Sequence, residues 1–217
     1  PGISPKALPA IDIIIISHNH YDHLDEQFIK SLPNKEKIHV FVPLKLKKFF
    51  TERGYNFVHE LDWYETDSIY NFRMTALPTV HFTGRGITDK NKSLWCSWAI
   101  STPFGRYFFI GDSAYSPTIF NEIGNNIGSF DLAMVTIGTY GNRKYGVNNH
   151  TTPEEAINIG KEVKAKILLG MHWGTIELSD ENPWEPPKRF IETAQKAGFL
   201  SENIWIMKIG ETQIGRA

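Results

Sequence analysis

The most informative stretch of this sequence is residues 17–23, which read SHNHYDH and contain three imidazoles and one carboxylate. The stretch follows the apolar run at residues 11–16, which is too short to cross a membrane and is typical of a buried strand. In an extended chain His18 and His20 point to the same side, so one cation could bind both rings. Asp22 and His23 follow once the backbone has turned. They would meet a second cation roughly 3.5–4 Å away, the spacing of two-metal hydrolytic sites.

Three further ligand candidates lie at the ends of later predicted strands. His81 precedes a glycine-rich loop, Asp112 follows an apolar strand at residues 105–110, and His172 follows a strand at residues 166–170. Asp112 needs a partner, because burying an unpaired charge is costly. With the first stretch this gives seven imidazole or carboxylate ligands and no thiolate. Such a set suits zinc, with iron or manganese as alternatives.

We predict two metal ions that share Asp112, because a carboxylate has enough lone pairs for two cations. The ligands of the first ion would be His18, His20 and His81. The ligands of the second ion would be Asp22, His23 and His172. Such a site lowers the pKa of a bridging water from ~15.7 to near ~7, which supplies hydroxide at neutral pH. The predicted chemistry is therefore metal-assisted hydrolysis. The alternative for residues 17–25 is a polar loop that caps the next helix.

His150 lies in a loop rich in glycine and asparagine, directly before a well-marked helix start. Residues 152–155 read TPEE, with a threonine N-cap, a proline at the first helical position and a glutamate at the third. We predict that His150 contacts the substrate and binds no metal, so Asp22 and His150 are the candidate catalytic residues. The alternative is a loop histidine bonded only to backbone. His39 and His59 have no ligand-type neighbours in the sequence and are predicted to be structural.

The elements that must position these residues alternate between strands and helices. The predicted strands are residues 11–16, 38–42, 68–77, 94–101, 105–110, 131–137, 166–170 and 203–209. The predicted helices are residues 24–32, residues 44–52, a helix that starts at Thr152, and residues 187–198. Residues 94–101 and 105–110 should form a hairpin. Most of the candidate ligands therefore lie where a strand ends.

Composition excludes several classes of protein. With 217 residues and 41% hydrophobic residues, we expect a single globular domain over residues 1–217. The net charge is −1 and the basic residues are scattered, which argues against a nucleic-acid partner. One cysteine, Cys96, rules out an internal disulfide. The sequence contains no transmembrane stretch and no signal-peptide pattern, so we expect a soluble protein, with the cytoplasm as the favoured compartment.

Six aromatic side chains close to the candidate ligands could line a groove for an acyl chain, with ordinary core packing as the alternative. They are Phe82, Trp95, Trp98, Tyr115, Tyr140 and Trp173. Two cations can stabilise both the attacking and the leaving oxygen of an in-line displacement at phosphorus. We therefore expect a phosphodiester substrate with an apolar portion.

The order of these motifs resembles the metallo-β-lactamase superfamily, over residues 18–172. The shared pattern is His-x-His-x-Asp-His, a later His, a Gly-Asp strand end and a final His. Five segments closely resemble the branch of phospholipases D that hydrolyse N-acyl-phosphatidylethanolamine, together with its bacterial relatives. These segments are SHNHYDHLD (17–25), DKNKSLWCSW (89–98), GDSAYSP (111–117), PEEA (153–156) and HWGT (172–175).

This resemblance implies an α/β fold of four layers, an αβ/βα sandwich, with two metals between the edges of two sheets. It implies the same ligand sets, a His150 that meets the substrate phosphate or leaving group, and a phospholipase D-type cleavage that releases phosphatidic acid. The resemblance leaves open whether the protein contacts a membrane surface and whether it forms a homo-oligomer. Because ten residues precede the first strand, we expect the N-terminal strands of the family to be lacking. An exposed apolar edge at residues 11–17 would result.

Three other hypotheses remain. A lactonase or other carboxylic ester hydrolase could use the same metal-bound hydroxide on a carbonyl carbon. A redox member of the superfamily would use a flavin partner and two irons, but a glutamate is expected there in place of His20. A non-catalytic binding module would have lost the site, whereas every ligand position in this sequence is filled.

Overall fold

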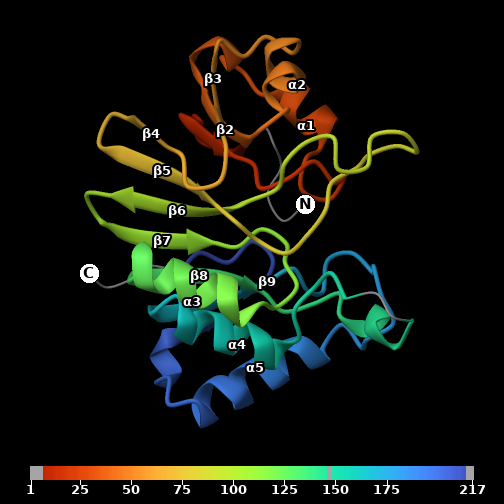
Figure 1. Cartoon of the computed structure of the whole chain (residues 1–217), viewed down its shortest axis with the longest axis vertical. Coiled ribbons are helices and arrows are strands. Elements are labelled where there is room, and N and C mark those ends of the chain that lie inside the picture. Colours follow the sequence, from red (N-terminus) through yellow and green to blue (C-terminus); the bar gives the residue numbers. More distant parts are fainter. Residues whose placement is uncertain (1–6, 146–147, 214–217) are drawn as a thin grey trace.

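The described residues of this computed structural model, 7–145 and 148–213, form two β-sheets that face each other, with helices on the outer faces. Figure 1 shows the smaller sheet with α1 and α2 at the top and the larger sheet with α3, α4 and α5 below it. The fold is therefore the four-layer α/β sandwich predicted from the sequence.

The smaller sheet contains three parallel strands in the order β1-β2-β3 among the described residues. Its strands and the helices beside it are β1 (Ile13–Ile15), α1 (Glu26–Ser31), β2 (His39–Pro43), α2 (Lys47–Thr51) and β3 (Phe57–Leu61). Strand β2 is buried on both faces. Val40 and Val42 pack under α1 and α2, whereas Phe41 points to the other sheet, because successive side chains of a strand alternate between faces.

The larger sheet has the order β10-β9-β8-β7-β6-β5-β4 in the described part of the chain. Its strands are β4 (Thr66–Ile69), β5 (Phe72–Leu77), β6 (Ser97–Thr102), β7 (Gly105–Phe109), β8 (Phe130–Thr136), β9 (Ala165–Met171) and β10 (Ile204–Ile206). Its helices are α3 (Pro117–Asn126), α4 (Pro153–Glu162) and α5 (Glu185–Lys196). Short 3-10 helices are η2 (Lys35–Lys37), η3 (Gly141–Tyr145) and η4 (Ser201–Asn203).

Strand direction explains why one edge of the larger sheet gathers the candidate residues. Strand β6 is antiparallel to both β5 and β7, and the pairs β7–β8 and β8–β9 are parallel. Strands β5, β7, β8 and β9 thus run in the same direction. The segments that follow them, which carry His81, Asp112, His150 and His172, leave the sheet at the same edge.

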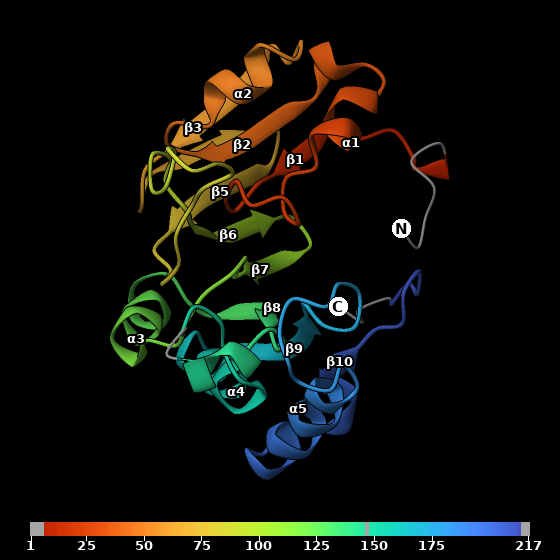
Figure 2. The ribbon, with the colours of Figure 1, turned by 90° about the vertical axis from the view of Figure 1, so that its right-hand side faces the viewer.

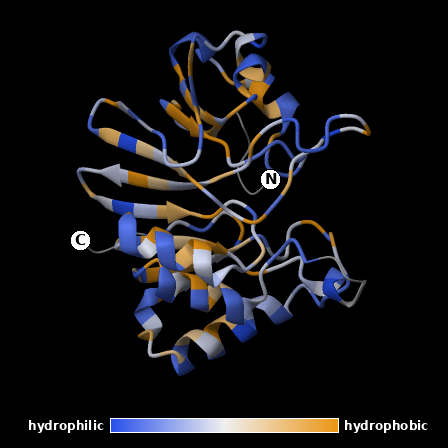
Figure 3. Ribbon diagram, viewed as in Figure 1, coloured by the Kyte–Doolittle hydropathy of each residue, from blue (hydrophilic) through white to orange (hydrophobic). Residues whose placement is uncertain are grey.

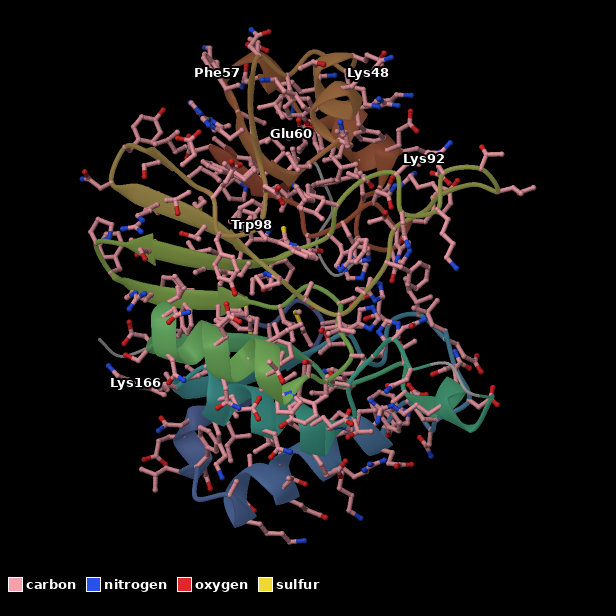
Figure 4. All side chains as sticks on the ribbon, viewed as in Figure 1. Lys48, Phe57, Glu60, Lys92, Trp98 and Lys166 are labelled. Carbon is pink, nitrogen blue, oxygen red and sulfur yellow. The ribbon has the colours of Figure 1, made fainter. Side chains whose placement is uncertain are left out.

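Three hydrophobic clusters fill the spaces between the four layers. One lies between the smaller sheet and its helices and includes Phe50 and Tyr55. A second lies between the sheets and includes Trp98, which Figure 4 labels in the interior. The third packs α3, α4 and α5 on the larger sheet. Figure 3 shows hydrophobic and hydrophilic stretches alternating along these helices, as expected for helices with one buried side.

Local sequence signals explain where several elements begin. Helix α4 starts with a complete capping box, in which the Thr152 hydroxyl accepts from the backbone N–H of Glu155 and the Glu155 carboxylate accepts from the backbone N–H of Thr152. Helix α1 begins after Asp25, whose carboxylate accepts from the backbone of Gln27 and Phe28. The predicted hairpin of β6 and β7 is also present. The predicted helix start at Thr152 and the predicted hairpin are confirmed, and the helix predicted at residues 24–32 is observed at residues 26–31.

Other predictions were wrong in detail. Residues 68–77, predicted as one strand, belong to the hairpin of β4 and β5, which turns at Tyr70 with φ of 51°. Strand β3 and helix α3 were not predicted. Helix α3 reads PTIFNEIGNN and has few apolar positions, so its pattern is weak. The predicted absence of N-terminal strands stays a prediction; in the described residues β1 pairs only with β2.

None of the described helices combines the length and apolar composition needed to cross a membrane.

Candidate metal centre

All seven candidate ligands lie together at the edge of the sandwich, as two groups that could each hold a metal ion. Four of them, at residues 18–23, follow β1 of the smaller sheet. The other three follow β5, β7 and β9 of the larger sheet. The two groups have Asp112 in common. The first is His18, His20, His81 and Asp112, and the second is Asp22, His23, Asp112 and His172. The two groups contain the same residues as the two ligand sets predicted from the sequence.

In the first group three ring nitrogens converge. Nδ1 of His20 lies 2.9 Å from Nε2 of His18 and 3.2 Å from Nε2 of His81. Both Nε2 atoms are also near Oδ2 of Asp112, at 3.8 Å for His18 and 3.7 Å for His81. Two nitrogens bound to one tetrahedral zinc at 2.0–2.1 Å would lie roughly 3.3 Å apart. The observed spacing is therefore close to that of a coordination shell.

The second group has similar dimensions. Oδ2 of Asp22 is 3.3 Å from Nε2 of His23 and 3.3 Å from Nε2 of His172. Asp112 completes the group, with Oδ2 at 3.1 Å from His23 and Oδ1 at 3.4 Å from His172. Asp112 thus presents both carboxylate oxygens to the cluster, as a ligand shared by two ions would.

The unsatisfied polar atoms of the cluster fit bound cations. Oδ1 of Asp112 and Nε2 of His23 are buried and lack a hydrogen-bond partner among the described residues. Asp112 is only 2% exposed, and a buried carboxylate oxygen without a partner carries a large desolvation cost. Metal ions would satisfy these atoms, and the nitrogen and oxygen donors suit zinc, iron or manganese.

Polar groups behind the rings hold three imidazoles with Nε2 facing the cluster. The hydroxyl of Ser17 lies 3.0 Å from Nδ1 of His18, and that of Thr139 lies 3.3 Å from Nδ1 of His172. Nδ1 of His81 donates to the carbonyl of Asn149 at 3.2 Å. Such outer partners fix the orientation of metal-binding histidines. None of these three contacts was predicted from the sequence, although Ser17 adjoins the first ligand.

Close backbone packing joins the two sheets at the site. Gly111 precedes Asp112 with φ of 65°, and a Cβ there would lie 2.4 Å from Cβ of Ser17. Only glycine therefore allows this approach. On the other side, the indole N–H of Trp98 donates to the carbonyl of Ile16 at 3.0 Å. These contacts set the position of Asp112 relative to the ligands that follow β1.

Burial and charge shift the pKa values of the ligands in different directions. Burial lowers the pKa of His18 to about 2 and that of His81 to about 3. Burial alone would also lower the pKa of His23, but the carboxylates of Asp112 and Asp22 outweigh it and raise the pKa to about 9. Burial alone would raise the pKa of Asp112, yet the nearby imidazole of His23, together with those of His172 and His150, holds it well below its usual range.

His150 faces the cluster from the loop after β8 without joining either group. Its Nδ1 lies 3.8 Å from Oδ2 of Asp112 and is a buried atom without a hydrogen-bond partner in the described residues. Its ring lies 5.3 Å from the rings of His81 and His172. Burial lowers the pKa of His150 to about 4. The backbone is held by Arg143, whose Nη2 donates to the His150 carbonyl at 2.7 Å.

A family model described as the β-lactamase superfamily domain matches residues 1–173, which include both ligand groups. The chain belongs to the β-lactamase superfamily. The four-layer architecture and the position of the ligand cluster agree with this assignment.

Relatives within the superfamily include an N-acyl-phosphatidylethanolamine-hydrolyzing phospholipase D from Caenorhabditis elegans, 35% identical over 87% of this chain and 56% of that protein. A mitochondrial protein of the same description from Saccharomyces cerevisiae is 34% identical over 95% of this chain and 45% of that protein. The chain thus spans about half the length of the curated relatives it matches. A metallo hydrolase from Ignicoccus hospitalis has a similar fold, with a TM-score of 0.71 over 93% of this chain and 78% of that one, at 16% identity.

The predicted aromatic groove is wrong in part. Trp98 is fully buried between the sheets, Tyr140 is 8% exposed, and Tyr115 packs against the core under α3–α5. Aromatic residues near a site in sequence are equally suited to the core, which explains the error. Phe82 does contact the site, with its ring 4.6 Å from that of His20. Trp173 lines a hollow beside the second ligand group.

A hollow of about 160 Å³ opens beside the second ligand group. Its lining combines ligand side chains with apolar ones: Asp22, Thr139, His172, Trp173, Thr175, Ile176 and Leu178. Ile176 is 56% exposed and Leu178 is 44% exposed. An apolar surface therefore adjoins the cluster on the side of His172.

Binding of the two ions should depend differently on pH. The lowered pKa values keep His18 and His81 neutral at neutral pH, so neither releases a proton when the first ion binds. His23, with a pKa of about 9, is protonated at neutral pH in the metal-free protein and must lose that proton to bind the second ion. We expect the affinity for the second ion to rise roughly tenfold per pH unit below about pH 9.

Calorimetry of zinc binding in buffers of different ionisation enthalpy measures this proton release. At about pH 6, where a metal-bound water with a pKa near ~7 largely keeps its proton, release of about one proton with one ion and almost none with the other is the expected result. If both ions bound without proton release, His23 would not be a protonated ligand.

Proposed function

We propose that this chain is a dinuclear, zinc-dependent phosphodiesterase of the phospholipase D type that acts on N-acyl phosphatidylethanolamine-like phospholipids. Three kinds of observation support the proposal: the two ligand groups joined at Asp112, the substrate named in the descriptions of two relatives, and the apolar hollow beside His172. The geometry of Asp112 carries most of the weight, because a shared ligand implies two ions at one reaction centre.

The ions would supply a nucleophile, since metal-bound water has a pKa near ~7, and would stabilise charge on both oxygens of an in-line displacement. The residues of the chain divide the remaining work. Asp112 would fix the spacing of the two ligand groups. His150, whose Nδ1 has no partner among the described residues, would bind a phosphate oxygen or the leaving group. Asp22 serves as ligand and borders the hollow, so it would also limit where the phosphate can lie.

The hollow suits the apolar part of a phospholipid. Trp173, Ile176 and Leu178 border it together with the ligands Asp22 and His172. A phosphate bound at the ligands would therefore have apolar side chains within reach of its substituents. This arrangement favours an amphiphilic phosphodiester over a small polar one.

The decisive experiment follows isotopic oxygen from labelled water. Zinc-loaded protein is incubated with micelles of N-acyl phosphatidylethanolamine and, separately, with a panel of lactones. We expect phosphatidic acid in which label has entered the phosphate, because water attacks phosphorus directly. Protein freed of metal by a chelator should give no product, and readdition of zinc should restore it.

Label found only in a carboxylate would contradict the proposal and favour a lactonase or other ester hydrolase. Metal content near zero, with no turnover of either substrate class after zinc addition, would favour a binding module.

A further inference from the structure

Arg85 belongs to neither ligand group, yet it contacts both ends of the loop that carries three of the ligands. Its Nη1 donates to the carbonyl of Asn19 at 2.9 Å and to the carbonyl of Leu24 at 2.7 Å. Between these two carbonyls lie His20 of the first group and Asp22 and His23 of the second. One guanidinium nitrogen therefore bridges the segment on which the spacing of the two groups depends.

We propose that Arg85 is a positioning residue that holds residues 19–24 in the shape needed to bind both metal ions. The inference rests on the proposed metal centre and is independent of the substrate.

Further contacts lock the Arg85 loop to the ligand loop. The hydroxyl of Tyr21 donates to the Arg85 carbonyl at 2.9 Å, and the backbone N–H of Gly84 donates to Oδ1 of Asn19 at 2.9 Å. The guanidinium carbon also lies 4.0 Å from the centre of the Tyr21 ring, a favourable cation–π distance. The segment after β5, which also carries His81, is thereby joined to the segment after β1. Figure 1 shows this yellow-green loop extending beside α1.

The chemistry of the side chain explains why an arginine suits this position. The turn inside the loop uses the carbonyl of His20, which accepts from the backbone of His23 and Leu24. The carbonyls of Asn19 and Leu24 point instead to a common donor. A guanidinium offers several N–H donors in one plane and stacks on an aromatic ring at the same time. Arg85 forms no ion pair with the carboxylates that the structure describes, so carbonyl groups and rings are its main partners.

Arg53 provides a matched control in the same region. Its guanidinium lies 3.8 Å from the Phe49 ring, and Arg85 lies 5.8 Å from the same ring. Arg53 donates to the Phe49 carbonyl and to Glu26, and no bond joins it to Asn19 or Leu24. Replacing Arg53 therefore removes a similar half-buried cation from the same neighbourhood without releasing the ligand loop.

The test measures zinc affinity without substrate. Metal-free wild type, Arg85→Ala, Arg85→Lys and Arg53→Ala compete for zinc with a chromophoric chelator, and thermal melting confirms that each is folded. We expect Arg85→Ala to weaken the binding of zinc roughly 10–100-fold, the usual effect of losing an outer-shell partner. Arg85→Lys should recover part of this loss because it keeps a cationic donor. Arg53→Ala should match wild type.

Cobalt substitution gives a second readout that stability alone does not change. The visible spectrum of bound Co²⁺ reports ligand geometry, so Arg85→Ala should alter the spectrum and Arg53→Ala should not. Wild-type affinity and spectrum in folded Arg85→Ala would overturn the inference, and so would equal losses in the two alanine variants. If Arg85→Ala does not fold, Arg85→Lys and Arg85→Gln decide, since unchanged affinity in both would also overturn it. Weakened zinc binding in Arg85→Ala, together with no phosphodiester cleavage by the zinc-loaded wild type, would refute the proposed function but not the role of Arg85.

Discussion

Replacing Asp112 by alanine is expected to remove both metal ions and with them nearly all hydrolysis. Asp112 contributes to both ligand groups, and its carboxylate lies within 3.1–3.8 Å of four ligand histidines and of His150. Without it, each ion loses a ligand and the repulsion between two cations is no longer offset. The loss of zinc affinity should exceed the roughly 10–100-fold that changes in outer-shell partners cost.

Elemental analysis after gel filtration, combined with the hydrolysis assay, measures this effect. His20→Ala, which removes a ligand from the first group only, should retain more metal and more activity than Asp112→Ala. Asp67→Asn is the matched control, because Asp67 also pairs with a histidine, His59, at 2.6 Å but lies outside both groups. Two zinc ions per chain in Asp112→Ala would disprove the shared ligand.

Asp112 also illustrates why much of the site could be predicted from the sequence. A carboxylate at the end of an apolar strand must find a partner, and parallel strands deliver the residues that follow them to one edge. His81, Asp112 and His172 were grouped with the ligands after β1 because each of them follows a predicted strand, and the observed strand directions explain why these strand ends meet. The remaining determinants are contacts between segments far apart in the chain, such as the approach of Gly111 to Ser17 and the hydrogen bonds of Arg85. No local pattern predicts them.

The same distinction applies to the fold. Helix α4 has a capping box and β2 contains the apolar run Val40-Phe41-Val42 before Pro43, so local signals were enough. Strand β3 reads FVHEL and pairs with β2, but its polar residues obscure the pattern of a buried strand. Trp98 shows the limit for side chains: whether an aromatic residue beside a site lines it or enters the core depends on the packing of both sheets, which the sequence does not display. Figure 2 shows strands β5 to β9 of the larger sheet one below the other, beneath β1 and β2 of the smaller sheet.

Replacing His150 by alanine is expected to leave both metal ions bound and to slow hydrolysis by roughly 10²–10⁴-fold, the range for a residue that transfers a proton or stabilises a reacting phosphate. His150 lies outside both ligand groups, and its Nδ1 faces Asp112 without a hydrogen-bond partner among the described residues. The loop should survive the change, because Arg143 binds the His150 carbonyl and pairs with Glu155 of the α4 capping box. Metal content and kcat, measured on the same sample, separate the two effects.

His39→Ala is the matched control for this variant, since His39 is a half-buried histidine whose Nδ1 lies 2.9 Å from Nε2 of His59, away from the ligand cluster. It should retain normal kcat and metal content. Loss of zinc from His150→Ala would make His150 a metal ligand, and an unchanged kcat would leave it as a loop residue bonded only to its neighbours. A lower kcat with two zinc ions bound would support direct contact with substrate. The pH profile then separates the two roles of a substrate-binding imidazole, because a proton donor contributes an ionisation that disappears in His150→Ala, whereas a neutral hydrogen-bond donor changes the rate without changing the profile.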